Sequence, residues 1–130
     1  MTHSHDLSQA HEITLDIDGA KVFPELGILK KQAPTNGGFL WITTGSPPGS
    51  VAQPGPNYVT FSIDWLGVTP WIASCSITEQ SPDGTPHVGA AYFDTLSVQL
   101  DQPGQFIRVV FNMEWQWPLP TFAMIIIGYM

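Results

Sequence analysis

The sequence predicts an all-β domain, and three observations support this fold class. Charged residues make up only 12% of the 130-residue chain, whereas glycine and proline number 12 each. Few charges and many turn-forming residues are typical of short strands joined by frequent reversals. Several segments also alternate apolar and polar side chains, as half-buried strands do. We expect an antiparallel, jelly-roll-like β-sandwich of about eight or nine strands, with a closed β-barrel as the alternative.

The N-terminal part of the chain predicts an arm, a hairpin and a third strand. Residues 1–11 are polar, and we interpret them as a flexible arm that precedes one domain spanning residues 12–130. Apolar residues alternate from Ile13 to Ile17, and Asp18-Gly19 predicts a tight turn into a second strand at residues 20–23. After a connection, residues 39–44 predict a strand.

The middle of the chain predicts a long loop followed by three further strands. Residues 45–57 contain four prolines and three glycines, too many for regular structure, so we expect a surface loop. Alternating apolar residues predict strands over 58–65 and 71–79. A turn at residues 81–84 extends to Gly89, and residues 90–94 predict a short strand.

The clearest local prediction is a β-hairpin from Leu96 to Trp115. Two alternating segments flank Gln102-Pro-Gly-Gln105, which has proline at the second turn position and glycine at the third. This order is typical of a type II turn, because proline presets φ and glycine accepts the positive φ that follows. We therefore expect a positive φ at Gly104.

The last segment, residues 122–129, is apolar at nearly every position. A strand with two apolar faces is covered on both sides, either within its domain or by a neighbouring subunit. Because the chain also has few surface charges, we expect a homo-oligomer.

The charge of the chain excludes several function classes. Four lysines and arginines against eleven acidic residues give a formal net charge of −7. Four cations cannot form the basic face that nucleic acids or anionic membranes require. We find no signal-peptide pattern and no membrane span, and expect a soluble cytoplasmic protein, with export by a dedicated machine or release by lysis left open. The single cysteine, Cys75, is interpreted as a small buried hydrophobe.

Two sets of residues could support enzymatic chemistry. His3, His5 and His11 are possible metal ligands, although we interpret them as part of the arm and expect no cofactor. Asp64 and Glu114 could form a glycosidase pair if they lay about 5 Å apart, for a retaining enzyme, or about 6.5–9.5 Å apart, for an inverting one. Both occupy the solvent-facing phase of their strands, so an ordinary solvated role is the simpler interpretation.

Aromatic side chains are the remaining candidates for ligand binding, since flat rings beside polar groups hold sugars or anchor subunits. Trp65 and Trp115 fall in the inward phase and are expected in the core. Trp71 and Trp117 adjoin prolines at strand ends and are expected at the surface. The candidate ligand-binding residues are therefore Trp71, Trp117, Tyr58 and Asn57, a pattern that is not specific for one ligand.

The sequence leaves three functional hypotheses open. The leading one is a non-enzymatic binding or assembly module that forms a homo-oligomer and takes a carbohydrate (as a lectin does) or another protein as its partner. The second is a small metal-dependent or carboxylate-based enzyme on the same sandwich. The third is a structural coat or decoration subunit. No motif names a substrate.

Overall fold

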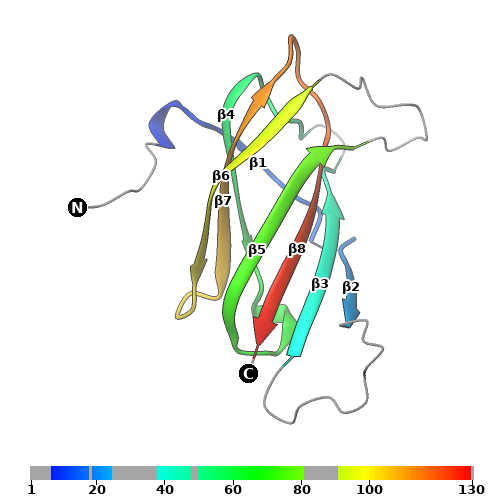
Figure 1. Ribbon diagram of the computed structural model, residues 1–130, viewed down its shortest axis with the longest axis vertical. Coiled ribbons are helices and arrows are strands. Elements are labelled where there is room, and N and C mark those ends of the chain that lie inside the picture. The colour runs from blue at the N-terminus through cyan, green and yellow to red at the C-terminus, as the bar shows by residue number, and fades with distance from the viewer. Residues whose placement is uncertain (1–6, 18, 25–37, 48–49, 81–90, 130) are drawn as a thin grey trace.

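The computed structural model describes residues 7–17, 19–24, 38–47, 50–80 and 91–129, and these form a β-sandwich (Figure 1). The predicted fold class is confirmed, and the alternative of a closed barrel is wrong, because eight strands form two separate four-stranded sheets. In spatial order, sheet A contains β1 (His11–Ile13), β4 (Gly55–Ser62), β7 (Phe106–Glu114) and β6 (Tyr92–Asp101). In the same way, sheet B contains β2 (Lys21–Pro24), β3 (Gly38–Gly45), β8 (Thr121–Tyr129) and β5 (Pro70–Glu79). Two short 3-10 helices, η1 (Leu7–Gln9) and η2 (Asp64–Leu66), complete the described elements.

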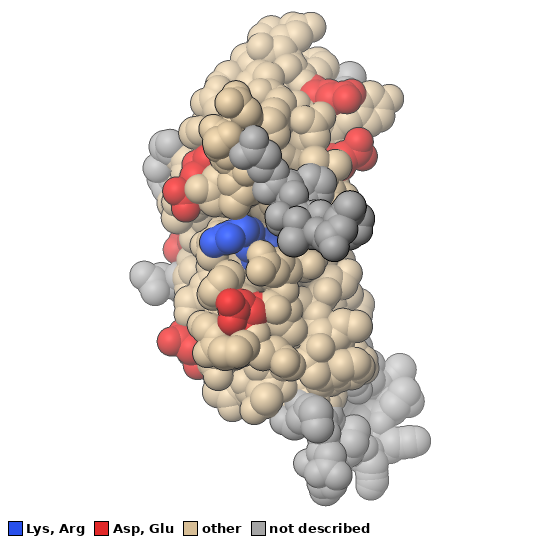
Figure 2. Space-filling view, turned by 90° about the vertical axis from the view of Figure 1, so that its left-hand side faces the viewer, with Lys and Arg blue, Asp and Glu red and all other residues tan. Residues whose placement is uncertain are grey.

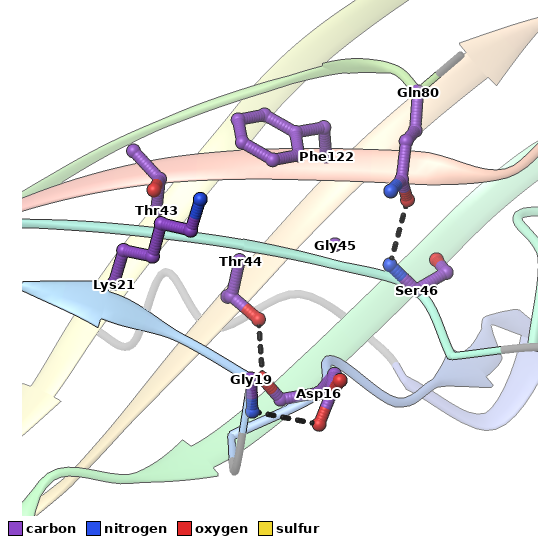
Figure 3. A pocket seen from close by; sticks show the side chains of 9 residues that line it. All are labelled: Asp16, Gly19, Lys21, Thr43, Thr44, Gly45, Ser46, Gln80 and Phe122. Atoms are coloured by element: carbon purple, nitrogen blue, oxygen red, sulfur yellow. Dashed lines mark hydrogen bonds between the residues drawn. The ribbon is translucent and has the colours of Figure 1, made fainter. Parts of the chain in front are cut away.

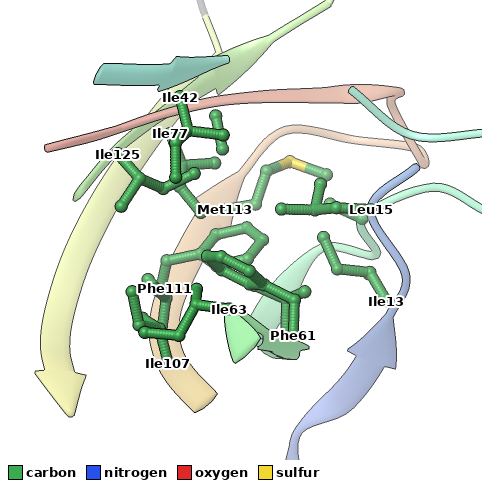
Figure 4. Packing of buried hydrophobic residues seen from close by; sticks show 14 of the residues in the cluster. Ile13, Leu15, Ile42, Phe61, Ile63, Ile77, Ile107, Phe111, Met113 and Ile125 are labelled. Carbon is green, nitrogen blue, oxygen red and sulfur yellow. The ribbon is translucent and has the colours of Figure 1, made fainter. Parts of the chain in front are cut away.

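The hydrophobic core lies between the two sheets (Figure 4). Alternate residues of β7 point inward, and Ile107, Val109 and Phe111 are fully buried there. From sheet B, Ile125 and Ile127 of β8 meet them with no exposed surface. The period-two alternation of the sequence thus specifies which side chains fill the sandwich.

The predicted β6–β7 hairpin is confirmed, but its turn differs from the expected type. The positive φ of +54° belongs to Gln105, whereas Gly104 is not among the positive-φ glycines of the described residues. The Asp101 carboxylate explains the difference, because its Oδ1 accepts a hydrogen bond from Gly104 N at 2.7 Å. Gln105 N then bonds to Gln102 O at 3.3 Å, and the chain re-enters the strand through Gln105.

Strand β6 differs from the sequence prediction in length and in one side-chain direction. The separate strand expected at residues 90–94 is the beginning of β6, which runs unbroken from Tyr92. Its pairing with β7 shifts between Thr95 and Ser97. The alternation of Leu96, Val98 and Leu100 in the sequence predicts an inward Leu96, but this residue is the extra one of the bulge and is 46% exposed, so that prediction is wrong.

The hairpin predicted at Asp18-Gly19 is wrong, although the buried residues before it are as expected. Ile13 and Leu15 are buried in the core. The strand β1 pairs in parallel with β4 of sheet A, whereas β2 pairs antiparallel with β3 of sheet B. The glycine marks a crossover between sheets, with Gly19 N bonded to Asp16 Oδ1 at 3.0 Å.

The N-terminal arm and the long loop both contain more order than expected. Within the described residues, Leu7–Gln9 form η1 and His11 begins β1, and residues 1–6 lie outside the described part. In the loop, Ala52 is fully buried and exchanges two backbone hydrogen bonds with Leu119, of 2.8 and 3.0 Å. The strand β4 begins at Gly55 rather than at Tyr58. It also ends earlier, so Trp65 lies in η2, is exposed rather than in the core, and bonds to Ser62 O.

Strand β8 does not have two buried faces within one chain. It lies in the middle of sheet B, between β3 and β5. Ala123, Ile125 and Ile127 are buried in the core, whereas Phe122 and the intervening apolar residues are only partly covered. The outward apolar face of β8 therefore becomes part of the molecular surface.

Candidate functional site: the outer face of sheet B

The two sheets present outer faces of very different character. Strand register places Glu12, Asp94, Arg108 and Glu114 on the outer face of sheet A. Among the described residues on the outer face of sheet B, Lys21 is the only charged one. Figure 2 shows the side of the molecule at the left of Figure 1, where one blue group lies among several red ones. The outer face of sheet B therefore differs from that of sheet A, because its described residues include no acidic side chain.

One end of this face carries an apolar patch that surrounds Gly128 of β8. The patch comprises Phe39, Trp41, Trp71, Ile72 and Ile126. Trp71 reaches this face because the register of β5 shifts between Pro70 and Ile72, which makes Trp71 the bulged residue.

The glycine at the centre of the patch allows its side chains to converge. A Cβ on Gly128 would lie 2.7 Å from Ile72 Cγ2, 3.1 Å from Phe39 Cε1 and 3.2 Å from Trp71 Cε2. The first distance is too short for a real Cβ and the other two are tight, so glycine lets the two rings and the isoleucine pack directly over the backbone of β8. Ile72 remains 47% exposed and Trp71 50% exposed despite this contact. The result is a contiguous apolar surface rather than scattered exposed residues.

A pocket of about 250 Å³ lies at the other end of sheet B, where β3 ends and β8 begins (Figure 3). We call it the sheet B pocket. Lys21 and Thr43 lie on one side of it, and Ser46 and Gln80 lie on the other. The described residues that line it are Asp16, Gly19, Lys21, Thr43, Thr44, Gly45, Ser46, Gln80 and Phe122.

Hydrogen bonds fix the polar groups of the sheet B pocket. Asp16 N bonds to Gly45 O at 2.8 Å, and Thr44 Oγ1 donates to Asp16 O at 2.6 Å. Asp16 Oδ1 accepts from Gly19 N, so the carboxylate is held in one orientation. Across the pocket, Gln80 Oε1 accepts from Ser46 N at 3.0 Å. This bond assigns the amide and leaves Gln80 Nε2 as the donor.

The four residues predicted as a ligand site are not brought together. Trp71 and Trp117 are both exposed, as expected. Trp71 adjoins the C-terminal end of β8, and Trp117 precedes its N-terminal end. A strand of this length spans roughly 27 Å. Tyr58 lies on the outer face of sheet A, opposite Val110.

Asn57, the fourth predicted residue, is fully buried and bonded to its own chain. Its Oδ1 accepts from Gln53 N at 2.9 Å, and its Nδ2 donates to Gln53 O and Gly55 O at 2.8 and 2.9 Å. The side chain therefore organises the end of the loop before β4 by satisfying backbone groups that would otherwise be buried without partners.

Trp115 and Trp117, in the segment between β7 and β8, contact each other. Their ring centroids are 5.7 Å apart at an angle of 77°, an edge-to-face arrangement. Trp115 packs partly against the core, near its expected position. Its Nε1 is buried and finds no acceptor among the described residues.

The structure gives no support to the two enzymatic hypotheses. His3 and His5 lie outside the described residues, and His11 is exposed on β1. No group of three or more potential ligands gathers in the described part of the chain. Asp64 follows Ser62, which pairs with Phe106 at one end of β7, whereas Glu114 ends that strand. Eight residues of strand separate them by roughly 27 Å, far beyond the spacing of a glycosidase pair.

Cys75 faces the core from β5, opposite Ile125. Burial raises the pKa of this thiol to about 12 because the thiolate would lose its hydration. The thiol is therefore protonated at neutral pH, as befits a packing residue rather than a nucleophile.

Comparison of the chain with protein-family models, with curated proteins and with solved structures finds no match. The described residues also include no helix with the length and hydrophobicity that crossing a bilayer requires.

Proposed function

We propose that this chain is a non-enzymatic assembly module that associates with copies of itself through the outer face of sheet B. The observation that carries the proposal is the apolar patch. Its five residues form a continuous apolar surface, whereas the outer face of sheet A carries Glu12, Asp94, Arg108 and Glu114. Large exposed apolar patches mark interaction surfaces in soluble proteins.

Charge favours a second copy as the occupant of this face. Each copy carries a formal net charge of −7, so two copies repel each other at most approach directions. No acidic side chain lies on the outer face of sheet B among the described residues. Contact through this face therefore brings no acidic side chain of its described residues into the interface and covers the apolar patch.

The size of the face is also suitable for association. The four strands, about 4.8 Å apart and from four residues (β2) to ten residues (β5) long, cover roughly 500 Å² as a flat surface, before side-chain relief is counted. Stable interfaces take about 800 Å² from each partner. The face is thus of the same order as an interface of standard size.

The test compares two variants that place the same charge on equally exposed residues. Ile72→Asp changes a residue of the apolar patch that is 47% exposed. Leu96→Asp changes a residue of β6 in sheet A that is 46% exposed. We expect sedimentation velocity to show concentration-dependent association of the wild type. In the Ile72→Asp variant, the Kd of self-association should be at least tenfold higher than in the wild type, a difference of about 1.4 kcal/mol. The reason is that a carboxylate in the contact loses its hydration.

The Leu96→Asp control should associate like the wild type. A wild type that is monomeric throughout the micromolar range would overturn the proposal. Equal weakening by both variants would also overturn it, since net charge and not the patch would then govern association.

A further inference from the structure

We infer that the sheet B pocket binds a single neutral sugar ring, either free or at the end of a longer glycan. This site is separate from the apolar patch, and the inference does not rest on self-association. It concerns residues that the aromatic pattern of the sequence did not indicate, above all Asp16, Gln80 and Phe122.

The polar groups of the pocket suit hydroxyl groups in particular. Gln80 Nε2 and Lys21 Nζ are donors, and Asp16 Oδ2 is an acceptor. Thr43 Oγ1 can act in either role. None of these four atoms has a hydrogen-bond partner among the described residues of the chain. A sugar hydroxyl both donates and accepts, so adjacent hydroxyls of one ring can satisfy such a mixed set.

The charge of the lining favours a neutral ligand. Among the described residues of the lining, Asp16 and Lys21 are the charged ones, and their formal charges cancel. An anion such as phosphate would meet the Asp16 carboxylate, and a cation would meet the Lys21 ammonium. A neutral polyol gains hydrogen bonds to both charged groups without that repulsion, and such bonds are stronger than those between neutral groups.

The remaining part of the pocket supplies an apolar surface. The Phe122 ring lies on the side of the pocket formed by β8, and the residue is 36% exposed (Figure 3). Aromatic rings pack against the C–H face of a pyranose while polar neighbours bind its edge. The volume of about 250 Å³ lies below the roughly 300–1,000 Å³ of sites for drug-sized ligands, which fits one ring rather than a long chain.

The polar groups of the sheet B pocket are already held in place, which favours ligand binding over a chance grouping of polar residues. Three of the lining residues, Asp16, Thr44 and Ser46, are fixed by hydrogen bonds that join β3 to the β1–β2 crossover and to Gln80. Gly45 leaves room for this arrangement, because a Cβ there would collide with the Gln80 side-chain amide. A ligand therefore need not order the site before binding, which lowers the entropic cost.

The experiment is an NMR titration of the full chain, following the backbone amides of Gly19, Gly45, Ser46 and Gln80. The probes are the methyl α-glycosides of glucose, mannose and galactose, with glycine as a zwitterion and inorganic phosphate as an anion. We expect saturable shifts at these amides with at least one glycoside, at millimolar Kd, and none with glycine or phosphate.

Matched variants connect the shifts to the pocket. Phe122→Leu removes the ring but keeps an apolar side chain, and Lys21→Met removes one donor from an exposed position; each should weaken binding at least fivefold. Phe39→Leu makes the same ring deletion at the opposite end of β8, where exposure is 41%, and should leave binding unchanged. The same titration of Ile72→Asp should give wild-type affinity, which separates this inference from self-association.

Three outcomes would overturn the inference. One is the absence of saturable shifts with all three glycosides. Another is a saturable response of the same amides to glycine or phosphate, which would mean a charged ligand. The third is wild-type affinity in Phe122→Leu and Lys21→Met, which would place the sugar elsewhere on the chain.

Discussion

Single residues in this sandwich have conformations that their neighbours impose on them. The hairpin turn is the clearest case, since the proline and glycine of Gln102-Pro-Gly-Gln105 are typical of a type II turn. The Asp101 carboxylate binds Gly104 N, and the left-handed conformation moves one residue on, to Gln105. Turn propensity depends only on the residues of the turn, whereas the observed geometry also depends on Asp101, the residue that precedes them.

The turn geometry makes Gln105 sensitive to branching at Cβ. Gln105→Val should lower the free energy of unfolding by about 1 kcal/mol or more, because β-branched residues are strained at positive φ. Gln105→Gly should be neutral or slightly stabilising, since glycine adopts this conformation without strain. Urea denaturation measures both changes.

The control for this prediction is Gln99→Val, on the exposed side of β6 where valine is favoured. It should be neutral or stabilising. An equal loss of stability at Gln99 and Gln105 would mean that the cost does not come from backbone strain.

At the scale of elements, β8 contributes one of its faces to the core and the other to the molecular surface. Ile125 is fully buried between the sheets, and Ile126, the next residue, belongs to the apolar patch. Ile125→Asp should prevent folding, because a buried carboxylate without partners costs several kcal/mol. Ile126→Asp should leave the fold intact and weaken self-association. Near-UV circular dichroism with sedimentation velocity distinguishes the two.

This pair of substitutions is informative because the residues are adjacent and chemically identical. If Ile126→Asp unfolded the chain as Ile125→Asp is expected to do, the outward face of β8 would be part of the core. If both variants folded, the assignment of Ile125 to the core would be wrong.

The strands themselves were largely predictable, but their partners were not. The alternation of apolar and polar residues predicted β3, β5, β7 and the buried residues of β4, since it depends only on which face of a strand is buried. Neighbour choice depends on contacts between distant segments, so the parallel pairing of β1 with β4 left no local trace. A glycine turn is equally compatible with a hairpin and with a crossover between sheets, which is why Asp18-Gly19 misled the prediction.

The candidate site was less predictable than the fold for the same reason. The exposure of Trp71 followed from its position at a strand end beside proline. The apolar patch also required Phe39 and Trp41, which come from a different strand and carry no local signal of exposure. The sheet B pocket combines Asp16, Gln80 and Phe122, which lie far apart in the sequence and meet only because the strand ends converge.

At the scale of the whole molecule, the low charge density and the acidic balance act against each other. Charged residues are only 12% of the chain, so little of the surface resists association. The charges that exist are mostly negative, and they repel a second copy at a distance. The proposed assembly therefore depends on ionic strength in a direction that can be stated in advance.

Raising the salt concentration should strengthen self-association of the wild type. The Debye length falls from about 30 Å at 0.01 M to about 3 Å at 1 M, so salt screens the repulsion between copies while leaving apolar contact in place. Sedimentation velocity at about 20 mM and about 500 mM NaCl should show a lower Kd at the higher concentration. Glu12→Gln combined with Glu114→Gln removes two negative charges from the outer face of sheet A, so this variant should associate more tightly at low salt and respond less to added salt. Association that weakens with salt would mean that ion pairs, and not the apolar patch, hold the copies together.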